Sequence, residues 1–394
     1  MKTSARIPAS LDAFATAKLD ALEAKNQRRR LVSSARTDGM AMRVDDGPEL
    51  ISFTDNDYLG LSTHPEVIEA AREAASRFGA GAGASRLVTG NHPLYAALEE
   101  SLARIKGTED ACVFGSGYLA NVGIIPTLVG AGDLIIADEL VHTCIHAGMQ
   151  LSKATVRFFR HSDVEHAREI LQAERGKFDR ALMVVDGVYS MDGDIAPLQA
   201  LGALAAEYDA WLMNDDAHAL GTIGGGRGSA HHLDAAHLVP LQMGTLSKAV
   251  GSYGGYLAAS KPVVDLMRTR ARSFIYTTGL PPAAVGAAIK ALELIENDTA
   301  LVARPTKLAQ DFALALDLPR PETPIVPLVI GTESDALAAS AALAVQGFKV
   351  IAFRPPTVPE GTSRLRFSFS ASHRDADVDR LIEACRALDL GGSA

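Results

Sequence analysis

Short apolar runs alternate with helical patterns through the middle of the chain. The apolar runs lie at 113–114, 134–137, 156–159, 181–185, 210–213, 239–243 and 256–259, and helical patterns lie at 118–129, from 141, at 163–174 and at 198–207. Apolar runs of this length, separated by helices, predict βαβ units and an α/β fold built on a mostly parallel sheet.

The two ends of the chain follow other patterns. A helix is expected at 11–30 and a hairpin at 41–53 around Asp46-Gly47; further helices are expected at 64–78, 93–105, 261–272 and 281–296. Strands or helices at 325–330, 334–346, 349–353, 364–370 and 376–388 predict a smaller α+β domain. We therefore predict an N-terminal helix and hairpin arm (1–52), a large domain (53–280) and a C-terminal α+β domain with its connecting helix (281–394).

Composition narrows the class of protein. The chain has 394 residues, 47% hydrophobic and 22% charged, which excludes intrinsic disorder. A net charge of −9 argues against a general nucleic-acid binder. The three cysteines, Cys112, Cys144 and Cys385, are widely spaced and predict no disulfide scaffold. No signal peptide and no apolar run long enough for a membrane span is visible, so we expect a cytoplasmic protein without a membrane partner.

Polar residues gather where the predicted strands end. In open parallel sheets, ligands bind outside the carboxyl ends of the strands. The residues at these ends are Ser116, Gly117, His142, Asp186, Ser190, Asp215, His218, Thr245 and Lys248. Any one of them alone suits a helix cap or an exposed surface. Their convergence on one edge predicts a binding site there.

The chemistry of three of these residues is specific. A lysine that is partly desolvated has a lowered pKa and can form a Schiff base, and Lys248 lies between hydroxyl-bearing and glycine-rich segments. Asp215 could pair with a pyridinium nitrogen, as enzymes that use pyridoxal 5′-phosphate (PLP) require. His218 could reach a phenolic oxygen on the same ring.

Several of these motifs also fit other kinds of site. The turn at Ser116-Gly117-Tyr118 could form a phosphate nest at a helix start, or be an ordinary tight turn. His142 and His146 have the spacing of a zinc pair, but no H-E-x-x-H accompanies them, and we expect no metal. A Walker-type phosphate loop is absent, and the glycine run at 79–84 follows a helix rather than a strand, which argues against a dinucleotide site.

Seven segments together resemble one family. They lie at 55–60, 115–121, 186–194, 214–218, 244–248, 276–278 and 354–359, and the likeness extends from Gln27 to Leu388. The Asp215, His218 and Lys248 set resembles fold-type I PLP-dependent enzymes, and the finer motifs resemble the α-oxoamine synthases. The resemblance implies that fold: a seven-stranded, mostly parallel large domain and a smaller α+β domain.

The resemblance also implies roles for the matching residues. The catalytic residues would be Lys248, His142, Asp215 and His218. The PLP-binding residues would be Ser116, Gly117, Tyr118, His142, Asp186, Ser190, Asp215, His218, Thr245, Lys248 and, toward the other subunit of a homodimer, Thr278. The substrate-binding residues would be Asn56 and Arg366 for the amino acid, and Arg28, Arg354 and Thr357 for the acyl donor. Asp186 stands where other members carry Glu, so a water-mediated contact is expected there.

The segment at 354–359, with Arg364 and Arg366 after it, points to one reaction within the family. The expected reaction is decarboxylative condensation of L-alanine with a pimeloyl thioester of CoA or an acyl-carrier protein, giving 8-amino-7-oxononanoate for biotin synthesis. The alternatives are the glycine C-acetyltransferase, 5-aminolevulinate synthase and serine palmitoyltransferase types. A non-catalytic protein of this fold usually lacks the lysine, which is present here.

Overall fold

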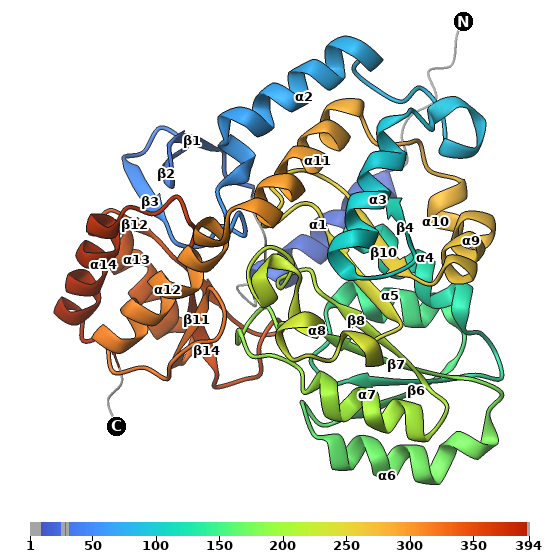
Figure 1. Cartoon of the computed structure of the whole chain (residues 1–394). Coiled ribbons are helices and arrows are strands. Elements are labelled where there is room, and N and C mark those ends of the chain that lie inside the picture. The colour runs from blue at the N-terminus through green and yellow to red at the C-terminus, as the bar shows by residue number, and fades with distance from the viewer. Residues whose placement is uncertain (1–8, 25–27, 29–30, 392–394) are drawn as a thin grey trace, which may run out of the picture.

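The computed structural model describes residues 9–24, 28 and 31–391. A sheet of seven strands forms its centre (Figure 1). In spatial order the strands are β4 (Asp110–Phe114), β10 (Gly255–Ala259), β9 (Leu241–Thr245), β8 (Trp211–Asp215), β7 (Ala181–Asp186), β5 (Leu134–Asp138) and β6 (Thr155–Phe159). Only β10 runs antiparallel to its neighbours among these strands. The predicted fold class, a mostly parallel seven-stranded sheet, is confirmed.

Helices cover both faces of the large sheet because successive strand residues point to opposite sides. Leu182 and Val184 of β7 pack into one core, whereas Met183 and Val185 pack into another. The first face is covered by α4 (Gly117–Leu128), α5 (Thr143–Ser152), α9 (Lys261–Arg270) and α10 (Arg272–Ile275). The second is covered by α2 (Pro65–Phe78), α3 (Leu94–Lys106), α6 (Val164–Glu174), α7 (Leu198–Glu207), α8 (Ser229–His232) and α11 (Pro282–Asn297). The inner strands of this sheet are therefore buried on both sides, whereas the edge strand β6 leaves Arg157 and Phe158 exposed.

Two small sheets form the rest of the ordered body. One contains β1 (Ser34–Asp38), β2 (Ala41–Val44), β3 (Glu49–Ser52) and β12 (Phe348–Lys349), and the other β11 (Ile325–Gly331), β14 (Ser363–Ser368) and β13 (Ile351–Phe353). The expected hairpin is present as β2 and β3, and β3 also pairs with β12 in parallel. The hairpin thus shares a sheet and a core with the C-terminal segment, while the three-part division of the chain stays a prediction.

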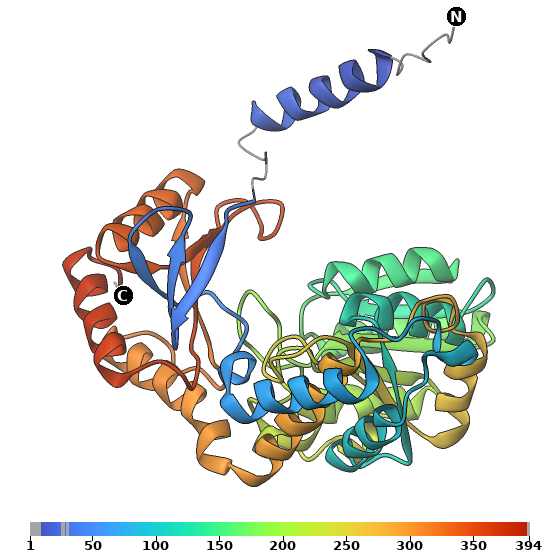
Figure 2. The ribbon, with the colours of Figure 1, turned by 90° about the horizontal axis from the view of Figure 1, so that it is seen from above.

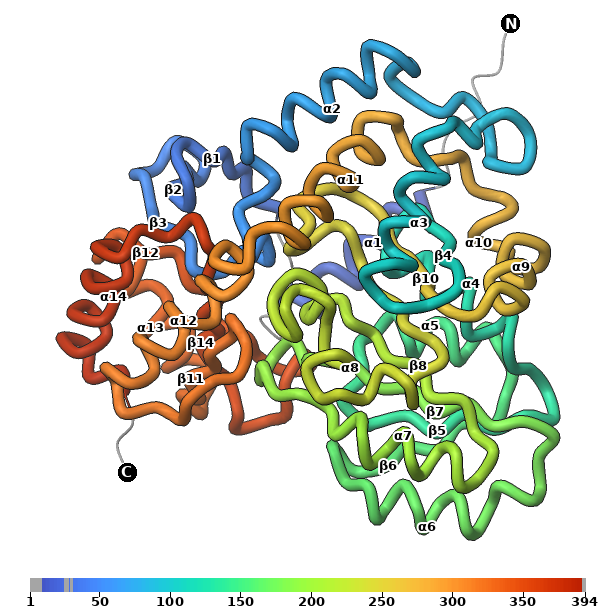
Figure 3. Tube along the Cα trace, in the orientation of Figure 1, coloured from blue at the N-terminus to red at the C-terminus, as the bar shows by residue number. Residues whose placement is uncertain are grey.

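The C-terminal helices are α12 (Thr299–Ala315), α13 (Glu333–Val345) and α14 (Asp375–Ala387). The chain passes from α11 straight into α12, as Figure 3 shows. Residues 299–315 carry no pattern from which a helix was predicted. Pro305, inside α12, is a residue that normally interrupts helices, yet Val302, Leu308, Ala309 and Phe312 line one buried face. Burial of that face outweighs the amide that Pro305 lacks.

The N-terminal helix α1 (Ala9–Glu23) projects away from the body in Figure 2. It is shorter than the expected 11–30, and 25–27 and 29–30 lie outside the described residues. None of its residues is buried, although Leu11 and Phe14 are apolar. Short helical turns complete the fold: η1 (Leu61–Thr63), η2 (Arg86–Gly90), η3 (Arg175–Lys177), η4 (Gly224–Gly226) and η5 (Ala236–Leu238). Within the described ranges, no helix is long and apolar enough to cross a membrane.

Candidate active site

A cavity of about 220 Å³ lies where strands β7, β8 and β9 end. Each of these strands ends in a polar residue that lines it: Asp186, Asp215 and Thr245. The lining residues are Ser116, Gly117, Tyr118, His142, Cys144, Asp186, Val188, Asp215, Ala217, His218, Met243, Thr245, Ser247 and Lys248. Eight of the nine residues named at the predicted sheet edge are therefore neighbours in space, all but Ser190.

Lys248 and His218 are in direct contact inside this cavity. The Lys248 Nζ lies 2.7 Å from His218 Nε2. Burial lowers the pKa of the Lys248 amine to about 8, while the carboxylates of Asp215 and Asp186 oppose that shift. Burial, together with the Lys248 cation, also lowers the pKa of His218 well below its usual value. The pair can therefore supply a neutral imidazole and an amine that loses its proton near physiological pH.

Asp215 is held by two hydrogen bonds at the end of β8. Its Oδ2 accepts from Asn121 Nδ2 at 2.9 Å, and its Oδ1 accepts from the Ala217 amide at 3.0 Å. Asn121 lies four residues after Gly117 on α4, which places both on one helix face. A buried carboxylate fixed in this way is suited to pair with a protonated ring nitrogen.

Asp186 is the less satisfied of the two carboxyl groups. Its Oδ2 accepts from the His142 amide at 3.1 Å, but its buried Oδ1 has no partner among the described residues. Burial and the negative charge of Asp215 raise the pKa of Asp186 well above its usual value, although Lys248 opposes them. His142 caps α5, where its Nδ1 accepts from the Cys144 amide at 3.3 Å, and burial lowers its pKa.

A narrow cradle forms where β4 leads into α4. Ser116 caps α4 by accepting from the Leu119 amide at 3.1 Å. A Cβ on Gly117 would lie 3.3 Å from Thr245 Cβ, and one on Gly255 would lie 2.5 Å from the Ser116 carbonyl oxygen. Side chains at these glycines would close the space in front of the helix start. Free amides at a helix start favour an anion such as phosphate.

These residues fit the PLP that the resemblance implies. The cavity offers an amine of lowered pKa, a fixed carboxylate, an imidazole and a glycine-lined helix start, and one buried oxygen, Asp186 Oδ1, still lacks a partner. Lys248 would hold the aldehyde carbon, Asp215 the ring nitrogen, and Ser116, Gly117 and Thr245 the phosphate.

A second group of residues adjoins this cavity through His218. Arg366 of β14 is only 3% exposed. Its Nη2 donates to Tyr58 Oη at 3.0 Å and to Asn56 Oδ1 at 3.2 Å. Tyr58 Oη in turn lies 2.7 Å from His218 Nδ1. Asn56 and Arg366, both expected at the amino-acid substrate, are therefore brought together next to His218.

Other predicted residues lie apart from the cavity lining. Ser190 is half-buried in the loop after β7, and Thr278 lines a separate small cavity with Arg86 and Tyr95. Arg354 and Thr357 lie on one turn, where the Thr357 amide donates to the Arg354 carbonyl. Arg28 is exposed and pairs with Glu23 at 3.4 Å. The roles predicted for these residues stay predictions.

Tyr58, Asn121 and Cys144 are among the residues of the site that were not singled out from the sequence. Tyr58 and Asn121 belong to motifs that were recognised as whole segments, and the helical spacing of Gly117 and Asn121 was the available signal. Cys144 lines the cavity and receives a hydrogen bond from Asn121 Nδ2 at 3.1 Å. Its two-residue spacing from His142 gave no comparable signal.

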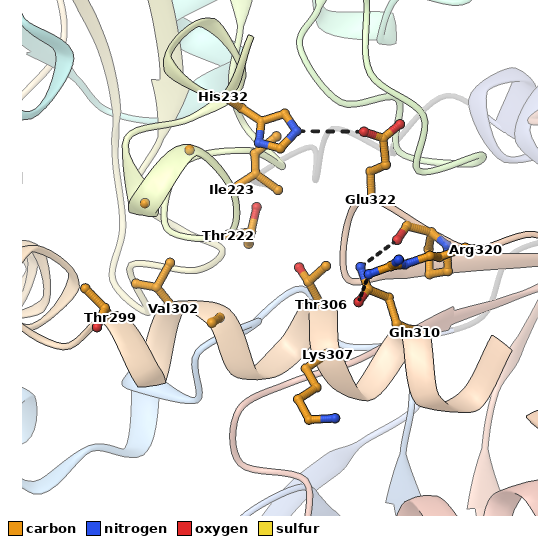
Figure 4. Close-up of a pocket in the computed structure, with 14 residues that line it drawn as sticks. Thr222, Ile223, His232, Thr299, Val302, Thr306, Lys307, Gln310, Arg320 and Glu322 are labelled. Carbon is orange, nitrogen blue, oxygen red and sulfur yellow. Dashed lines mark hydrogen bonds and ion pairs between the residues drawn. The ribbon is translucent and has the colours of Figure 1, made fainter. Parts of the chain in front are cut away.

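A larger cavity of about 750 Å³ lies between α12, the η4 turn and the segment 320–322 (Figure 4). Four of its polar residues pair with one another: His232 faces Glu322 at 3.8 Å, and Arg320 donates to Gln310 at 3.1 Å. It contains neither an aspartate nor a buried lysine. The smaller cavity at the strand ends is therefore the candidate active site.

Known proteins resemble this chain in sequence and in fold over nearly its whole length. The family model "Aminotransferase class I and II" matches residues 48–385. The 8-amino-7-oxononanoate synthase of Methylocella silvestris is 61% identical over 87% of this chain and 97% of its own. The enzyme of the same name from Beijerinckia indica is 55% identical over 96% of this chain and 98% of its own.

Solved structures of related enzymes have the same fold as this chain. Sphingomonas wittichii serine palmitoyltransferase superposes with a TM-score of 0.87 at 31% identity, covering 98% of this chain and 100% of its own. A further serine palmitoyltransferase structure, described as containing PLP, matches with a TM-score of 0.87 at 29% identity over the same shares of both chains. Sequence and structure together show that the chain belongs to the 8-amino-7-oxononanoate synthase family, within the class I and II aminotransferases.

Proposed function

We propose that this chain catalyses the PLP-dependent condensation of L-alanine with a pimeloyl thioester. The reaction joins the alanine Cα to the pimeloyl carbonyl carbon, releases the thiol, and loses the alanine carboxyl group as CO₂ to leave 8-amino-7-oxononanoate. The observation that carries the proposal is the contact of Lys248 with His218 beside Asp215, in a chain 61% identical to a relative of that name.

When bound, PLP supplies an electron sink for a carbanion at the amino-acid Cα. Asp215 keeps the ring nitrogen protonated, which that role requires. The Lys248 amine removes the Cα proton and later returns one, and its pKa of about 8 suits proton transfer in both directions near neutral pH. His142 and His218 border the ring space, and Ser190 is proposed as a further PLP contact.

Arg366 is the proposed clamp for the alanine carboxylate. A guanidinium binds a carboxylate through two parallel hydrogen bonds, and this one is held by Tyr58 and Asn56. Fixing the carboxylate fixes the orientation of the bonds at Cα, which is a positioning effect on the rate. Arg28, Arg354 and Thr357 are proposed on the acyl-donor side, with either CoA or an acyl-carrier protein as the thiol.

A homodimer with shared sites is part of the proposal. Three large side chains are exposed on this chain: Tyr118, which lines the cavity, Tyr253, and Tyr276, which lies two residues before Thr278. The glycine run at 79–84 has room beside it, since a Cβ on Gly81 would meet nothing within 4 Å in this chain. Thr278 does not line its own chain's cavity. These features support a second copy packing here, with Thr278 reaching the partner's phosphate.

A substrate-pair assay tests the reaction. Purified protein loaded with PLP is given alanine, glycine or serine together with pimeloyl-, acetyl-, succinyl- or palmitoyl-CoA, and CO₂ and free thiol are measured. Alanine with pimeloyl-CoA is expected to be fastest. A faster reaction of serine with palmitoyl-CoA would assign the chain to the serine palmitoyltransferase type instead. Borohydride reduction should leave a pyridoxyl adduct on Lys248, and no adduct there would contradict the enzyme proposal.

A further inference from the structure

Tyr58 links the proposed substrate clamp to the catalytic lysine through one hydroxyl group. Its side chain is fully buried. Its Oη lies 2.7 Å from His218 Nδ1, 3.0 Å from Arg366 Nη2 and 3.3 Å from Asn56 Oδ1. On the far side of the imidazole, Nε2 meets Lys248 Nζ at 2.7 Å. A continuous chain of contacts therefore runs from Arg366 to Lys248.

Burial fixes how many protons Tyr58 and His218 carry in this series of contacts. Burial raises the pKa of the Tyr58 phenol, so it carries one proton, and burial lowers the pKa of His218, so its ring also carries one. The guanidinium of Arg366 can only donate and the Asn56 oxygen can only accept. The charged or titratable groups that act on the His218 ring are Lys248, Arg366 and His142.

Two arrangements satisfy the hydrogen-bonding groups, the second of them only when Lys248 does not face Nε2 as an ammonium. In the first, His218 Nδ1–H donates to Tyr58 Oη, and the Tyr58 hydroxyl turns to donate to Asn56, so Nε2 offers a lone pair to Lys248. In the second, the Tyr58 hydroxyl donates to His218 Nδ1, so Nε2 offers an N–H instead. In both, Arg366 donates to the same phenol oxygen and holds it in place.

We propose that Tyr58 is a positioning residue whose hydroxyl lets His218 change between its two neutral tautomers while Arg366 keeps the phenol oxygen fixed. The lone pair on Nε2 suits the free Lys248 ammonium. The N–H on Nε2 suits an anionic oxygen, such as the phenolic oxygen of PLP once Lys248 is engaged. The catalytic role in this inference rests on the proposed function. The exchange of tautomers itself needs only the side chains of this protein, without cofactor or substrate.

The first test uses the cofactor-free protein and nitrogen-15 NMR of labelled histidine. Wild-type protein at pH 6.5 is expected to show His218 protonated on Nδ1. Tyr58→Phe removes the acceptor of that proton, and Asn56→Leu removes the acceptor of the Tyr58 proton. Both variants should therefore shift His218 toward the form protonated on Nε2. His218 ring shifts that equal those of wild type in either folded variant would overturn the proposal.

Tyr256→Phe is the matched control. Tyr256 is also fully buried, and its hydroxyl has no partner among the described residues, so the variant removes a buried hydroxyl without touching the chain of contacts. Its His218 shifts should match those of wild type. Comparable shifts in Tyr256→Phe and Tyr58→Phe would assign the effect to general loosening of the core and overturn the proposal.

The second test uses the PLP-loaded protein. The pH midpoint of the absorbance of the lysine-bound cofactor should move by about half a unit or more in Tyr58→Phe and stay in place in Tyr256→Phe. kcat should fall at least about tenfold in Tyr58→Phe, and the KM for alanine should rise because Arg366 loses a partner. An unchanged absorbance midpoint with unchanged kcat would overturn the proposal. Absence of product from wild type would instead reject the proposed function, while the NMR comparison would still decide the inference.

Discussion

Asp186 and Asp215 stand opposite each other, as register partners on the neighbouring parallel strands β7 and β8. Both are nearly fully buried, yet their surroundings differ. Asp215 accepts from the Ala217 amide and from Asn121, whereas one oxygen of Asp186 has no partner among the described residues. Two adjacent buried carboxyl groups rarely both ionise, and burial together with the charge of Asp215 raises the pKa of Asp186, which favours the neutral form at Asp186 rather than at Asp215.

This asymmetry predicts that replacing each carboxyl group by an amide has unequal effects. Asp215→Asn should lower kcat/KM by about 100-fold, because a charge-assisted hydrogen bond to the ring nitrogen is lost. Asp186→Asn should lower PLP affinity and kcat/KM by no more than about tenfold, because a neutral amide replaces a neutral carboxyl group. Absorbance titration with PLP and steady-state rates measure both. Equal losses in the two variants would show that Asp186 acts as an anion.

The pKa of Lys248 predicts the pH dependence of cofactor loading. Only the unprotonated amine attacks an aldehyde, and with a pKa of about 8 about a tenth of it is unprotonated at pH 7. The rate of PLP binding to cofactor-free protein should therefore rise about tenfold between pH 7 and 8.5 and then level off. Stopped-flow absorbance measures this rate of PLP binding at each pH. A rate that keeps rising toward pH 10 would indicate an amine with an ordinary lysine pKa.

Much of the fold and half of the site followed from the sequence. The strands at 134–137, 181–185 and 210–213 were visible because strands buried on both faces read as continuous apolar runs. Lys248 and Asp215 were visible because polar residues after such runs gather at one sheet edge. Helix α12 was not predicted, because Pro305 normally argues against a helix. The helix forms because its apolar face is buried against distant parts of the chain.

Contacts made across domains could not be predicted. Tyr58, His218 and Arg366 are separated by more than a hundred residues each, and their meeting depends on how the small domain packs on the large one. The buried ion pair of Lys106 with Asp216 lies within the large domain, but its two residues are also far apart in the sequence, so it could not be predicted either. Lysine at the end of α3 suits an exposed helix terminus in sequence, and only the fold places its amine in the interior.

The Lys106–Asp216 pair gives a prediction about stability. The two side chains are fully buried with Nζ 2.6 Å from Oδ2. Lys106→Met should lower the free energy of unfolding by about 3–5 kcal/mol, since an uncompensated buried carboxylate remains. The double variant Lys106→Met/Asp216→Asn should recover most of that loss, because Asn214 and Ser229 can still donate to the remaining oxygen. Urea unfolding of the two single variants and the double variant completes the cycle; strictly additive losses would show that the pair does not interact.

His161 joins two carboxylates beside the loop that carries Ser190. Its Nδ1 lies 3.1 Å from Asp138 Oδ1 and its Nε2 lies 2.8 Å from Asp194 Oδ2. Hydrogen bonds to Asp138 and Asp194 raise the pKa of His161 to about 10, so it is a cation at neutral pH. The Tyr189 ring packs edge-on against it at 4.4 Å between centroids. The cation therefore fastens the loop after β7 to the end of β5.

Because the folded-state pKa of His161 lies above the unfolded value near 6.5, its contribution to stability is complete below pH 6.5 and is lost as the pH rises through about 10. His161→Gln should lower the free energy of unfolding by about 2–3 kcal/mol at pH 6.5, and this difference from wild type should shrink steadily up to pH 10. His237→Gln, at an exposed position, is the control and should follow wild type throughout. Thermal denaturation from pH 6 to 10.5 measures the three proteins; a constant gap between His161→Gln and wild type would mean that His161 stabilises the loop by packing alone.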